Sequence, residues 1–537
     1  MKKFFKNLGL VWKWLLRIVI VGGIGFFVFK FIQGKYYYEP PKAEKVSSKQ
    51  DYLASVKAPA PDTLVEYIPL SRGLMSKADS AVTRFTEGDS LVAKTLPDSL
   101  IPRAPQKVET VLGPPNIILI VMDDMGYGDL SAYGNKAIQT PTMDTLAKQG
   151  IMFDQYYTVS SESSPARASL LTGRYPIRTG VTRSLFPGEG LNTTYQKAVN
   201  VAQGLMEDEI TIAEPLKKAG YATSLVGKWH LGDKHPHLPN NFGFDNFLGV
   251  HVSHDMEPMH LYRNDEIILE HPLDATKLID SYTKEAVSFI GEQGENPFFL
   301  CLAHSFPHSP LYEVASIEKS LGGTYGDVMQ EIDRSVKKVW EAVMAANIQN
   351  NTIIIITSDN GPDTQGSTAG LRGRKHEVFE GGVRVPFIMW GPRLRTDKHR
   401  IDEPIASIDL FPTIMGMVGL ANPSDRIIDG KNLMPLILDP NTTSIGKRNI
   451  FYFWQEEPLA LRNGDYKYHF PHRTGRITRE YAILEGSKEG PFLFNISTDA
   501  EEVYNLLDVE TVKGEEMKKQ IEDFKQTLGT EARGWLQ

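Results

Sequence analysis

The chain contains very little cysteine, since Cys301 is the only one among its 537 residues. A lone cysteine cannot form an intrachain disulfide or a zinc site made of several thiolates, so disulfide-rich and zinc-finger scaffolds are excluded. It lies in the apolar stretch 298–302 and is expected to be a buried core residue. Basic residues are not in excess either, because the formal net charge is −8. This balance argues against a nucleic-acid partner, which would require clustered cations.

Residues 1–35 differ from this average composition. Lysines precede a mostly apolar stretch over residues 11–32, which is interrupted by two basic side chains in its first half. A helix of that length spans about 30 Å, the thickness of a bilayer core. We therefore expect an uncleaved membrane anchor, with a cleaved export signal as the alternative. Because the basic residues come first, the anchor is expected in the inner membrane and the rest of the chain in the periplasm.

Three further regions follow, and no internal repeat is visible. Residues 36–113 lack a strong helical or strand period, and we expect a stalk or linker with some local helix. Over residues 114–440, apolar runs alternate with helical patterns, which is typical of an α/β domain with a mostly parallel sheet. Residues 441–537 contain a predicted hairpin at Asn463-Gly464 and an apolar stripe of a terminal helix, which indicates a small α+β domain with an antiparallel sheet. Within the α/β domain we expect buried strands at 116–122, 221–226, 297–304 and 352–357, and helices at 140–150 and 328–343.

Acidic and amide side chains follow two of these predicted strands. Asp123 and Asp124 end the first strand, and Asp359 and Asn360 follow the strand at 352–357. The carboxyl ends of parallel strands share one edge of a sheet, where ligand sites are built. Each pair alone is better interpreted as a helix or turn cap. Together, their oxygens favour a hard divalent cation, Ca²⁺ or Mg²⁺.

The segment 161–173 is typical of a helix start. It has serines at the cap, Pro165 in the first turn and Gly173 near the stop. A helix N-terminus favours anions, and Arg167 lies one turn beyond Ser163, where it could hold a negative oxygen. From these residues alone, a capped surface helix is the better interpretation.

The same segment resembles the signature of the sulfatase family in its serine form. The pattern is Ser163-x-Pro165-x-Arg167, followed by Thr172-Gly173-Arg174. Other blocks of residues 114–440 resemble the family in chain order: Asp123-Asp124, Gly227-Lys228-Trp229-His230-Leu231-Gly232, Pro307-His308-Ser309-Pro310, Asp359-Asn360, and Lys375 before Glu380-Gly381-Gly382-Val383-Arg384. Gly243-Phe244-Asp245 and Ser253-His254-Asp255-Met256 are similar to the arylsulfatase A and N-acetylgalactosamine-6-sulfatase subgroup.

The resemblance implies an alkaline-phosphatase-like fold and hydrolysis of a sulfate monoester, with a sulfated carbohydrate as the expected substrate. It further implies that Ser163 is oxidised to formylglycine by a radical enzyme that uses S-adenosylmethionine. The metal ligands implied for Ca²⁺, or Mg²⁺, are Asp123, Asp124, Asp359, Asn360 and the modified Ser163.

The resemblance also implies roles for the remaining residues. Lys228, His308 and Lys375 are expected to contact the sulfate, and His254 to line the substrate pocket. His230 is expected to deprotonate the second hydroxyl of the hydrated formylglycine. His308, assisted by Lys375, is expected to protonate the leaving alcohol, and Arg167 to hold the deprotonated diol.

Two alternatives stay open at this point. One is a related metal-dependent phosphodiesterase or phosphonate-ester hydrolase, which can also use formylglycine. The other is a binding protein in which Ser163 is never oxidised, so that sulfated ligands are held without turnover. The sequence leaves the sugar and the position of its sulfate undetermined.

Overall fold

The computed structural model describes residues 46–58, 113–188, 202–314, 319–392, 394, 399–439, 441–473, 477–478, 483–484 and 488–536. The expected membrane anchor, residues 1–35, lies outside these described residues, as does most of the expected linker. Among the helices that are described, none is long and apolar enough to cross a membrane.

A ten-stranded sheet forms the centre of the α/β domain. Its strands, in spatial order, are β11 (Arg400–Ile401), β2 (Ile151–Phe153), β10 (Phe387–Trp390), β9 (Thr352–Ser358), β1 (Asn116–Asp123), β8 (Phe298–Pro307), β4 (Ala222–Lys228), β5 (Asn246–Val250), β6 (Leu261–Arg263) and β7 (Glu266–Leu269). The central strands β9, β1, β8, β4 and β5 are parallel, whereas β10, β6 and β7 run antiparallel to their neighbours. The four strands predicted from apolar runs are confirmed as β1, β4, β8 and β9.

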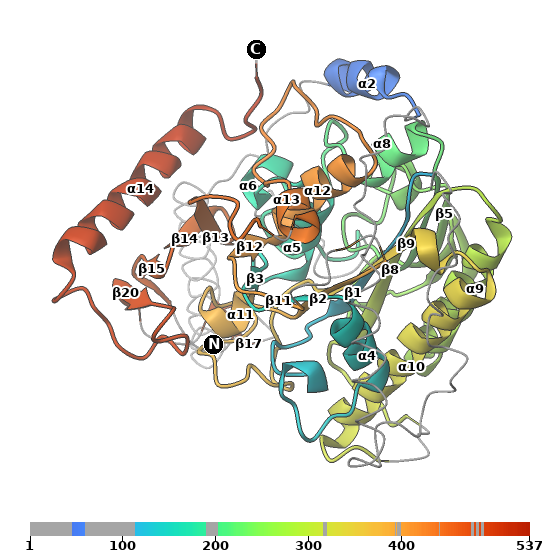
Figure 1. Cartoon of the computed structure of the whole chain (residues 1–537), viewed down its shortest axis with the longest axis horizontal. Coiled ribbons are helices and arrows are strands. Elements are labelled where there is room, and N and C mark those ends of the chain that lie inside the picture. The colour runs from blue at the N-terminus through green and yellow to red at the C-terminus, as the bar shows by residue number, and fades with distance from the viewer. Residues whose placement is uncertain are drawn as a thin grey trace, which may run out of the picture.

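Helices cover both faces of this sheet (Figure 1). One face carries α5 (Ser163–Thr172), α8 (Ala213–Lys218), α12 (Leu410–Met417) and α13 (Met434–Leu438), and the other carries α4 (Pro141–Gln149), α9 (Leu278–Glu292) and α10 (Gly323–Ala345). Strand β1 shows why its sequence is continuously apolar. Ile117 and Leu119 enter the core on the α5 side, while Ile118 and Ile120 enter the core on the α10 side.

The C-terminal region is built on an antiparallel sheet. Its strands, in spatial order, are β13 (Asn449–Trp454), β14 (Glu457–Asn463), β15 (Tyr466–His469) and β20 (Phe492–Asn495). The predicted hairpin is confirmed as β14–β15, although Asn463 pairs with Tyr466, so Gly464-Asp465 makes the turn. The terminal helix α14 (Thr511–Thr530) buries Met517 against this sheet, and Figure 1 shows both on the left, beside the large domain. The fold is therefore α/β with a separate small α+β unit.

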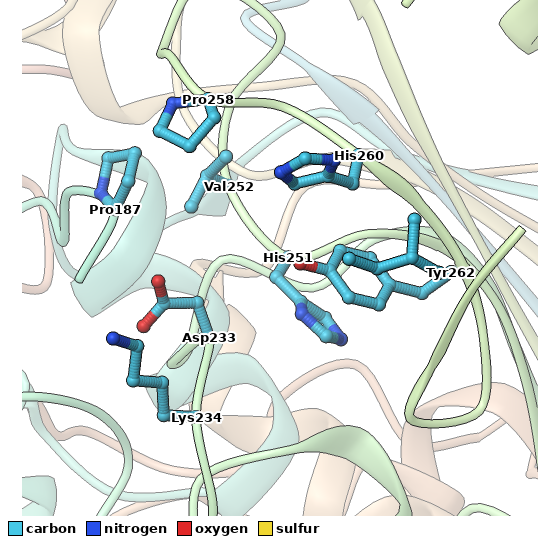
Figure 2. Close-up of a pocket in the computed structure, with 9 residues that line it drawn as sticks. Pro187, Asp233, Lys234, His251, Val252, Pro258, His260 and Tyr262 are labelled. Carbon is cyan, nitrogen blue, oxygen red and sulfur yellow. The ribbon is translucent and has the colours of Figure 1, made fainter. Parts of the chain in front are cut away.

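Short elements complete the described chain. They are α2 (Val46–Ser55), α6 (Pro176–Thr179), α11 (Glu380–Val383), the two-residue strands β3 (Tyr156–Tyr157), β12 (Ile405–Ala406), β16 (His472–Arg473), β17 (Ile477–Thr478), β18 (Ile483–Leu484) and β19 (Lys488–Glu489), and the 3₁₀ turns η3 (Ser131–Tyr133), η4 (Pro239–Phe242), η5 (Ala275–Lys277), η6 (Gln349–Asn351) and η7 (Ser407–Asp409). Beyond the end of β5, a cavity of about 140 Å³ lies beside His251 and Tyr262 (Figure 2).

Helix α2 lies within the segment expected to be a linker, and it packs against the α/β domain. The Lys49 ammonium is buried and pairs with Glu214 Oε1 at 2.7 Å, and it also donates to the carbonyl of Glu209 at 2.7 Å. The Tyr52 hydroxyl donates to the carbonyl of Ala421 at 2.9 Å. Polar contacts of this kind do not produce a periodic pattern of apolar residues. The packing of this helix against the α/β domain could therefore not be predicted from the sequence.

Candidate active site

Two parallel strand ends bring the predicted metal ligands together. Met122 of β1 is in register with Ser358 of β9, so Asp123 and Asp359 follow on adjacent strands. One carboxylate oxygen from each of Asp123, Asp124 and Asp359 lies within 4.8 Å of the others, and all three residues are buried. Asp124 adopts a φ of 66°, which turns the chain sharply at the strand end. The Asn360 amide donates to Asp124 Oδ1 at 2.7 Å and completes this oxygen-rich cluster.

Ser163 is the first residue of α5 and points at this cluster. Its Oγ lies 3.1 Å from Asp123 Oδ1 and 3.3 Å from Asn360 Oδ1. The predicted helix start is therefore confirmed, and Gly173 ends the helix with a φ of 71°. The interpretation as a surface helix is wrong, because every residue from Ser163 to Thr172 is buried beneath neighbouring elements. The Ser163 hydroxyl contacts the acidic cluster instead of capping the helix.

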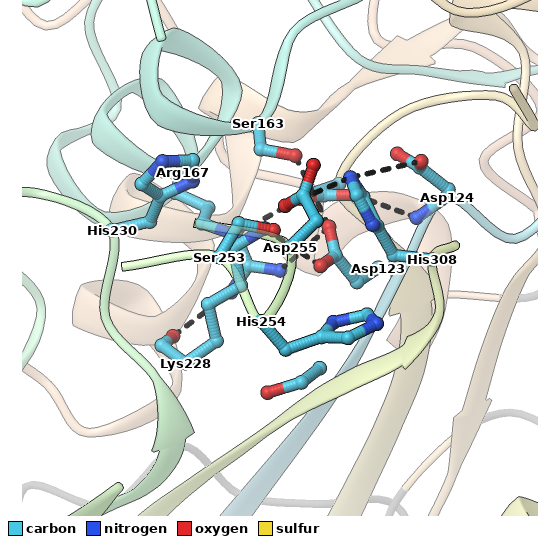
Figure 3. Close-up of polar contacts among 12 residues, drawn as sticks. Asp123, Asp124, Ser163, Arg167, Lys228, His230, Ser253, His254, Asp255 and His308 are labelled. Carbon is cyan, nitrogen blue, oxygen red and sulfur yellow. Dashed lines mark hydrogen bonds and ion pairs between the residues drawn. The ribbon is translucent and has the colours of Figure 1, made fainter. Parts of the chain in front are cut away.

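Three cations pair with the acidic cluster, each from a different segment of the chain, and Figure 3 labels two of them, Arg167 and Lys228. Arg167, one turn along α5, donates from Nε to Asp359 Oδ2 at 2.9 Å and lies 3.5 Å from Asp123 Oδ1. Lys228, the last residue of β4, donates to Asp123 Oδ2 at 2.6 Å. Lys375 donates to Asp124 Oδ2 at 2.8 Å. Without positive neighbours, three adjacent buried carboxylates could not remain ionised.

The histidines lie around the same cluster, and their hydrogen bonds set their tautomers. His230 Nε2 is 2.8 Å from the carbonyl of Leu185, which can only accept, so Nε2 carries the proton and Nδ1 holds a lone pair. Among the described residues, Nδ1 of His230 has no hydrogen-bond partner. His308 donates from Nδ1 to the carbonyl of Ser309, which leaves Nε2 facing Asp124 Oδ2 at 3.6 Å. His254 lies at a ring distance of 5.3 Å from His308.

The pKa values of the three carboxylates are shifted in different directions. Burial would raise the pKa of Asp123, but Lys228, His308 and Arg167 hold it well below its usual value. Burial raises the pKa of Asp124, against the opposing effect of Lys375. Burial also raises the pKa of Asp359, against Arg167. Burial therefore outweighs the nearby cations at Asp124 and Asp359 but not at Asp123.

The histidines are held neutral. Burial lowers the pKa of His230 well below its usual value, and Lys228 lowers it further. Burial and then Lys375 lower the pKa of His308 to about 4. A neutral His230 with a free lone pair is suited to accept a proton. His308 could donate one from Nε2 only after a bound anion has raised its pKa.

A divalent cation fits the donor set of this cluster. The three carboxylates and the Asn360 amide offer only oxygen ligands, the preference of Ca²⁺ and Mg²⁺. The raised pKa values of Asp124 and Asp359 show that further positive charge would be stabilised there.

The stretch Ser253-His254-Asp255, which the sequence suggested as a lining of the substrate pocket, also brings the two side chains that flank His254 to this site. Ser253 Oγ accepts a hydrogen bond from Lys228 Nζ at 3.1 Å, and Asp255 Oδ1 lies 4.0 Å from His308 Nε2. Figure 3 shows both beside the predicted residues. His308 and Lys375 lower the pKa of Asp255 to about 2, although burial opposes this. The signal was present, because Ser253-His254-Asp255 follows the strand β5 at the same edge of the sheet.

Comparisons with known proteins agree with this arrangement. The Sulfatase family model matches residues 115–420, a range that contains every site residue named above. N-acetylgalactosamine-6-sulfatase of Canis lupus familiaris is 37% identical over 382 residues, which cover 66% of this chain and 72% of the relative. The chain belongs to the sulfatase family.

Further relatives of this sulfatase extend the match. Arylsulfatase A of Bos taurus is 34% identical over 462 residues, covering 77% of this chain and 88% of the relative. A solved structure from work on the metabolism of multiple glycosaminoglycans by Bacteroides thetaiotaomicron superposes with a TM-score of 0.68 at 26% identity, covering 77% of this chain and 99% of the other. The protein is thus an enzyme that hydrolyses sulfate esters, with an alkaline-phosphatase-like fold and similarity to the arylsulfatase A and N-acetylgalactosamine-6-sulfatase subgroup.

Proposed function

We propose that this sulfatase removes sulfate from a carbohydrate monoester and that residue 163 acts after oxidation to formylglycine. The observation that carries the proposal is the environment of Ser163 Oγ. Its neighbours are Asp123 Oδ1 and Asn360 Oδ1, and no histidine nitrogen bonds to it within the described chain. A serine hydroxyl without a base is a weak nucleophile. Hydrated formylglycine instead carries two hydroxyls on one carbon.

The two hydroxyls divide the reaction into two steps. One hydroxyl attacks sulfur, so that a sulfur–oxygen bond forms to residue 163 and the bond to the sugar oxygen breaks. The second hydroxyl then loses its proton, its oxygen forms the carbonyl, and sulfate leaves as the carbon–oxygen bond to it breaks. The aldehyde is thereby restored. An unmodified serine lacks the second hydroxyl and would stay sulfated.

We assign the two proton transfers to the histidines of the site. His230 accepts the proton of the second hydroxyl at Nδ1, the nitrogen left with a lone pair by its bond to Leu185. His308 donates from Nε2 to the departing sugar oxygen. Its pKa of about 4 in the free chain rises when the sulfate anion binds beside it.

Positive charge at the site stabilises the transferring sulfate. Lys228 and Lys375 lie on different sides of the acidic cluster, where each binds a different carboxylate, and we propose that both turn to the sulfate oxygens. We propose Ca²⁺, with Mg²⁺ as the alternative, held by Asp123, Asp124, Asp359, Asn360 and residue 163. When bound, the cation lowers the pKa of a hydroxyl beside it and neutralises developing negative charge. Removal with EDTA should abolish turnover, and added Ca²⁺ should restore it.

The relatives support a sugar as the alcohol part of the substrate. One is named for N-acetylgalactosamine 6-sulfate, and a structural neighbour comes from work on glycosaminoglycan metabolism. We propose that a radical enzyme using S-adenosylmethionine oxidises Ser163. We also propose a periplasmic catalytic domain behind an inner-membrane anchor, which membrane fractionation of the native host would test.

Mass spectrometry of the peptide that contains Ser163, isolated from the native host, tests this function. An aldehyde at residue 163 together with release of sulfate from a sugar sulfate is the expected result. Faster cleavage of a phosphodiester than of any sulfate ester would favour the related phosphodiesterase chemistry. Intact serine in every active molecule would overturn the formylglycine mechanism.

A further inference from the structure

Asp255 lies on the loop that follows β5, and it differs from the other charged residues of the active site in its exposure. Its side chain is 28% exposed, whereas those of Asp124 and Lys375 are 2% and 8% exposed. The backbone N–H of Met256 donates to the carbonyl of Ser253 at 3.0 Å, and this turn holds the chain on either side of Asp255. The sulfate group must reach buried side chains, so the alcohol part of the ester is left on the solvent side, where Asp255 lies.

The carboxylate of Asp255 lies next to the nitrogen proposed to protonate the departing oxygen. Asp255 Oδ1 is 4.0 Å from Nε2 of His308, and Figure 3 marks this approach with a dashed line. Hydrogen bonds are about 2.8 Å long, so one ligand can bond to both atoms if it presents two oxygens close together. A sugar meets this requirement when it carries a hydroxyl group near its sulfated oxygen. The spacing therefore suits a hydroxyl against Asp255 while the ester oxygen lies against His308.

The Asp255 carboxylate is also free to accept such a bond. Among the described residues, the His308 ring is the only basic group within 4.0 Å of it. Burial lowers the pKa of His308 to about 4, so this ring is neutral near pH 7. The carboxylate therefore has no charged partner at this distance. An ionised acceptor forms stronger hydrogen bonds than a neutral one, so it can contribute substantially to the binding of a hydroxyl.

The negative charge of Asp255 indicates which part of the substrate it contacts. Lys228 and Lys375 supply the positive charge proposed to bind the sulfate, whereas a carboxylate close to the sulfate oxygens would oppose binding. Asp255 is therefore suited to the neutral, hydroxyl-bearing part of the substrate. By the same repulsion, it disfavours a second anionic group at that position, such as another sulfate or the carboxylate of a uronic acid.

We propose that Asp255 is a substrate-binding residue that accepts a hydrogen bond from a hydroxyl next to the sulfated oxygen. It thereby selects sugar sulfates in which that neighbouring position carries a free hydroxyl. The inference rests on the proposed function, since it takes the alcohol part of the ester to be a sugar. Replacing the hydroxyl with hydrogen removes the bond, and replacing it with a second sulfate brings two negative charges together.

A cycle of enzyme and substrate changes gives the first test. Turnover by the mature enzyme is measured on the 4- and 6-sulfates of galactose and N-acetylgalactosamine. The best of these is then compared with deoxy analogues that each lack one hydroxyl near the ester. Asp255→Ala should lower kcat/KM on the sugar sulfate about tenfold or more. On one deoxy analogue it should lower kcat/KM less than about twofold, because the hydroxyl that Asp255 binds is already absent.

This comparison separates substrate binding from an effect on proton donation. The sugar sulfate and its deoxy analogues all release a sugar alkoxide, so weaker donation by His308 would lower their kcat/KM by similar factors. Asp265→Asn is the matched control, because this side chain is 63% exposed and is paired with His235. Its kcat/KM should stay within about twofold on every substrate. Thermal unfolding of each variant verifies that the fold is retained.

A second sulfate on the sugar gives the second test. Asp255→Asn keeps an acceptor oxygen but removes the negative charge. It should lower kcat/KM on the monosulfate less than Asp255→Ala does. On the disulfate in which the neighbouring hydroxyl is also esterified, Asp255→Asn should raise kcat/KM about threefold or more, because the repulsion is gone. No gain on the disulfate would overturn the selection against a second anion.

The outcomes separate this inference from the proposed function. Equal losses for Asp255→Ala on the sugar sulfate and all its deoxy analogues, or no loss on any of them, would overturn the inference while the sulfatase mechanism stands. If the same sample hydrolyses 4-nitrophenyl sulfate but releases sulfate from none of the sugar sulfates, the sugar substrate of the proposed function is overturned, and this inference with it.

Discussion

The protein contains two buried clusters of charged side chains, and they differ in how their carboxylates are arranged. The catalytic cluster comprises Asp123, Asp124, Asp359, Arg167, Lys228 and Lys375. The junction cluster comprises Glu380, Lys467, His469 and Glu502, where the C-terminal sheet meets the large domain. In the junction cluster, Lys467 lies 2.9 Å from Glu380 and 3.2 Å from Glu502, and His469 bonds Glu502 at 2.7 Å. Every carboxylate oxygen of the two glutamates accepts a hydrogen bond.

Both clusters contain carboxylates with lowered and with raised pKa values. Burial would raise the pKa of Glu380, but Lys467 and Arg384 outweigh it and hold the pKa below its usual value. In the catalytic cluster, nearby cations hold the pKa of Asp123 low against burial, whereas burial outweighs the cations at Asp124 and Asp359 and raises their pKa values. Glu502 is the exception in the junction cluster, since burial raises its pKa to about 7 against the effect of Lys467. The convergence of three carboxylate oxygens within 4.8 Å of one another therefore distinguishes the catalytic cluster from the junction cluster, where Lys467 pairs with both glutamates.

The largest expected effect comes from Ser163→Ala, which should abolish most of the activity and leave the stability of the fold unchanged. We expect kcat to fall by about 10³-fold or more, because an alanine side chain has no oxygen with which to form the sulfated intermediate. Sulfate release measured by ion chromatography, with thermal unfolding of the same sample, provides the readout. Ser169→Ala is the control, since this serine is buried in the same helix; its kcat should stay within about twofold. A Ser163→Ala enzyme within tenfold of the parent would remove residue 163 from the mechanism.

Lys467→Met should have the opposite effect: it should lower the free energy of unfolding and leave kcat unchanged. It leaves Glu380 and Glu502 buried without their shared cation, a change that costs about 3–5 kcal/mol. Urea unfolding measures the loss, and kcat per folded molecule should be unchanged. The control is Lys525→Met, which removes an exposed ion pair with Glu457 and should cost less than about 1 kcal/mol. Equal losses in the two variants would show that the junction cluster contributes little.

Much of the fold was predictable because strands and helices bury apolar side chains at regular intervals along the sequence. The apolar run over 116–122 predicted β1 because a strand buried on both faces has no polar side chain to interrupt it. The burial of the helix that begins at Ser163 was not predictable, since it depends on α12 and η7 packing over residues that look polar enough for a surface. The docking of Lys49 into backbone carbonyls of residues 207 and 209 likewise depends on distant contacts.

The site residues at the ends of β1 and β9 were predictable, whereas those on the loop after β5 were less so. Asp123 and Asp359 follow apolar runs, so their proximity follows from a parallel sheet. Ser253 and Asp255 gave a weaker signal, because β5 is short and only tertiary packing aims these side chains at Lys228 and His308.

The smallest expected effect concerns Asp333, a buried carboxylate stabilised by neutral donors alone. It accepts hydrogen bonds from the backbone N–H groups of Thr142 and Met143 at the start of α4. Burial raises its pKa from 3.8 to about 6, although those N–H groups oppose the shift. The folded state therefore holds a proton that the unfolded state releases, and the stabilisation this gives, complete below about pH 4, is lost as the pH rises through about 6.

Asp333→Asn removes the ionisable carboxyl group, so the variant shows how much of the pH dependence comes from a buried carboxylate that has no cation beside it. The unfolding free energy of the variant relative to the parent should rise by up to about 3 kcal/mol between about pH 4 and pH 6.5, because only the parent loses stability over that range. Urea unfolding at the two pH values measures it. Asp280→Asn, on the exposed face of α9, is the control and should change stability by less than about 0.5 kcal/mol at either pH. If the Asp333→Asn difference does not vary with pH, backbone N–H groups alone keep a buried carboxylate ionised, and burial would lose its support as the cause of the raised pKa values of Asp124 and Asp359.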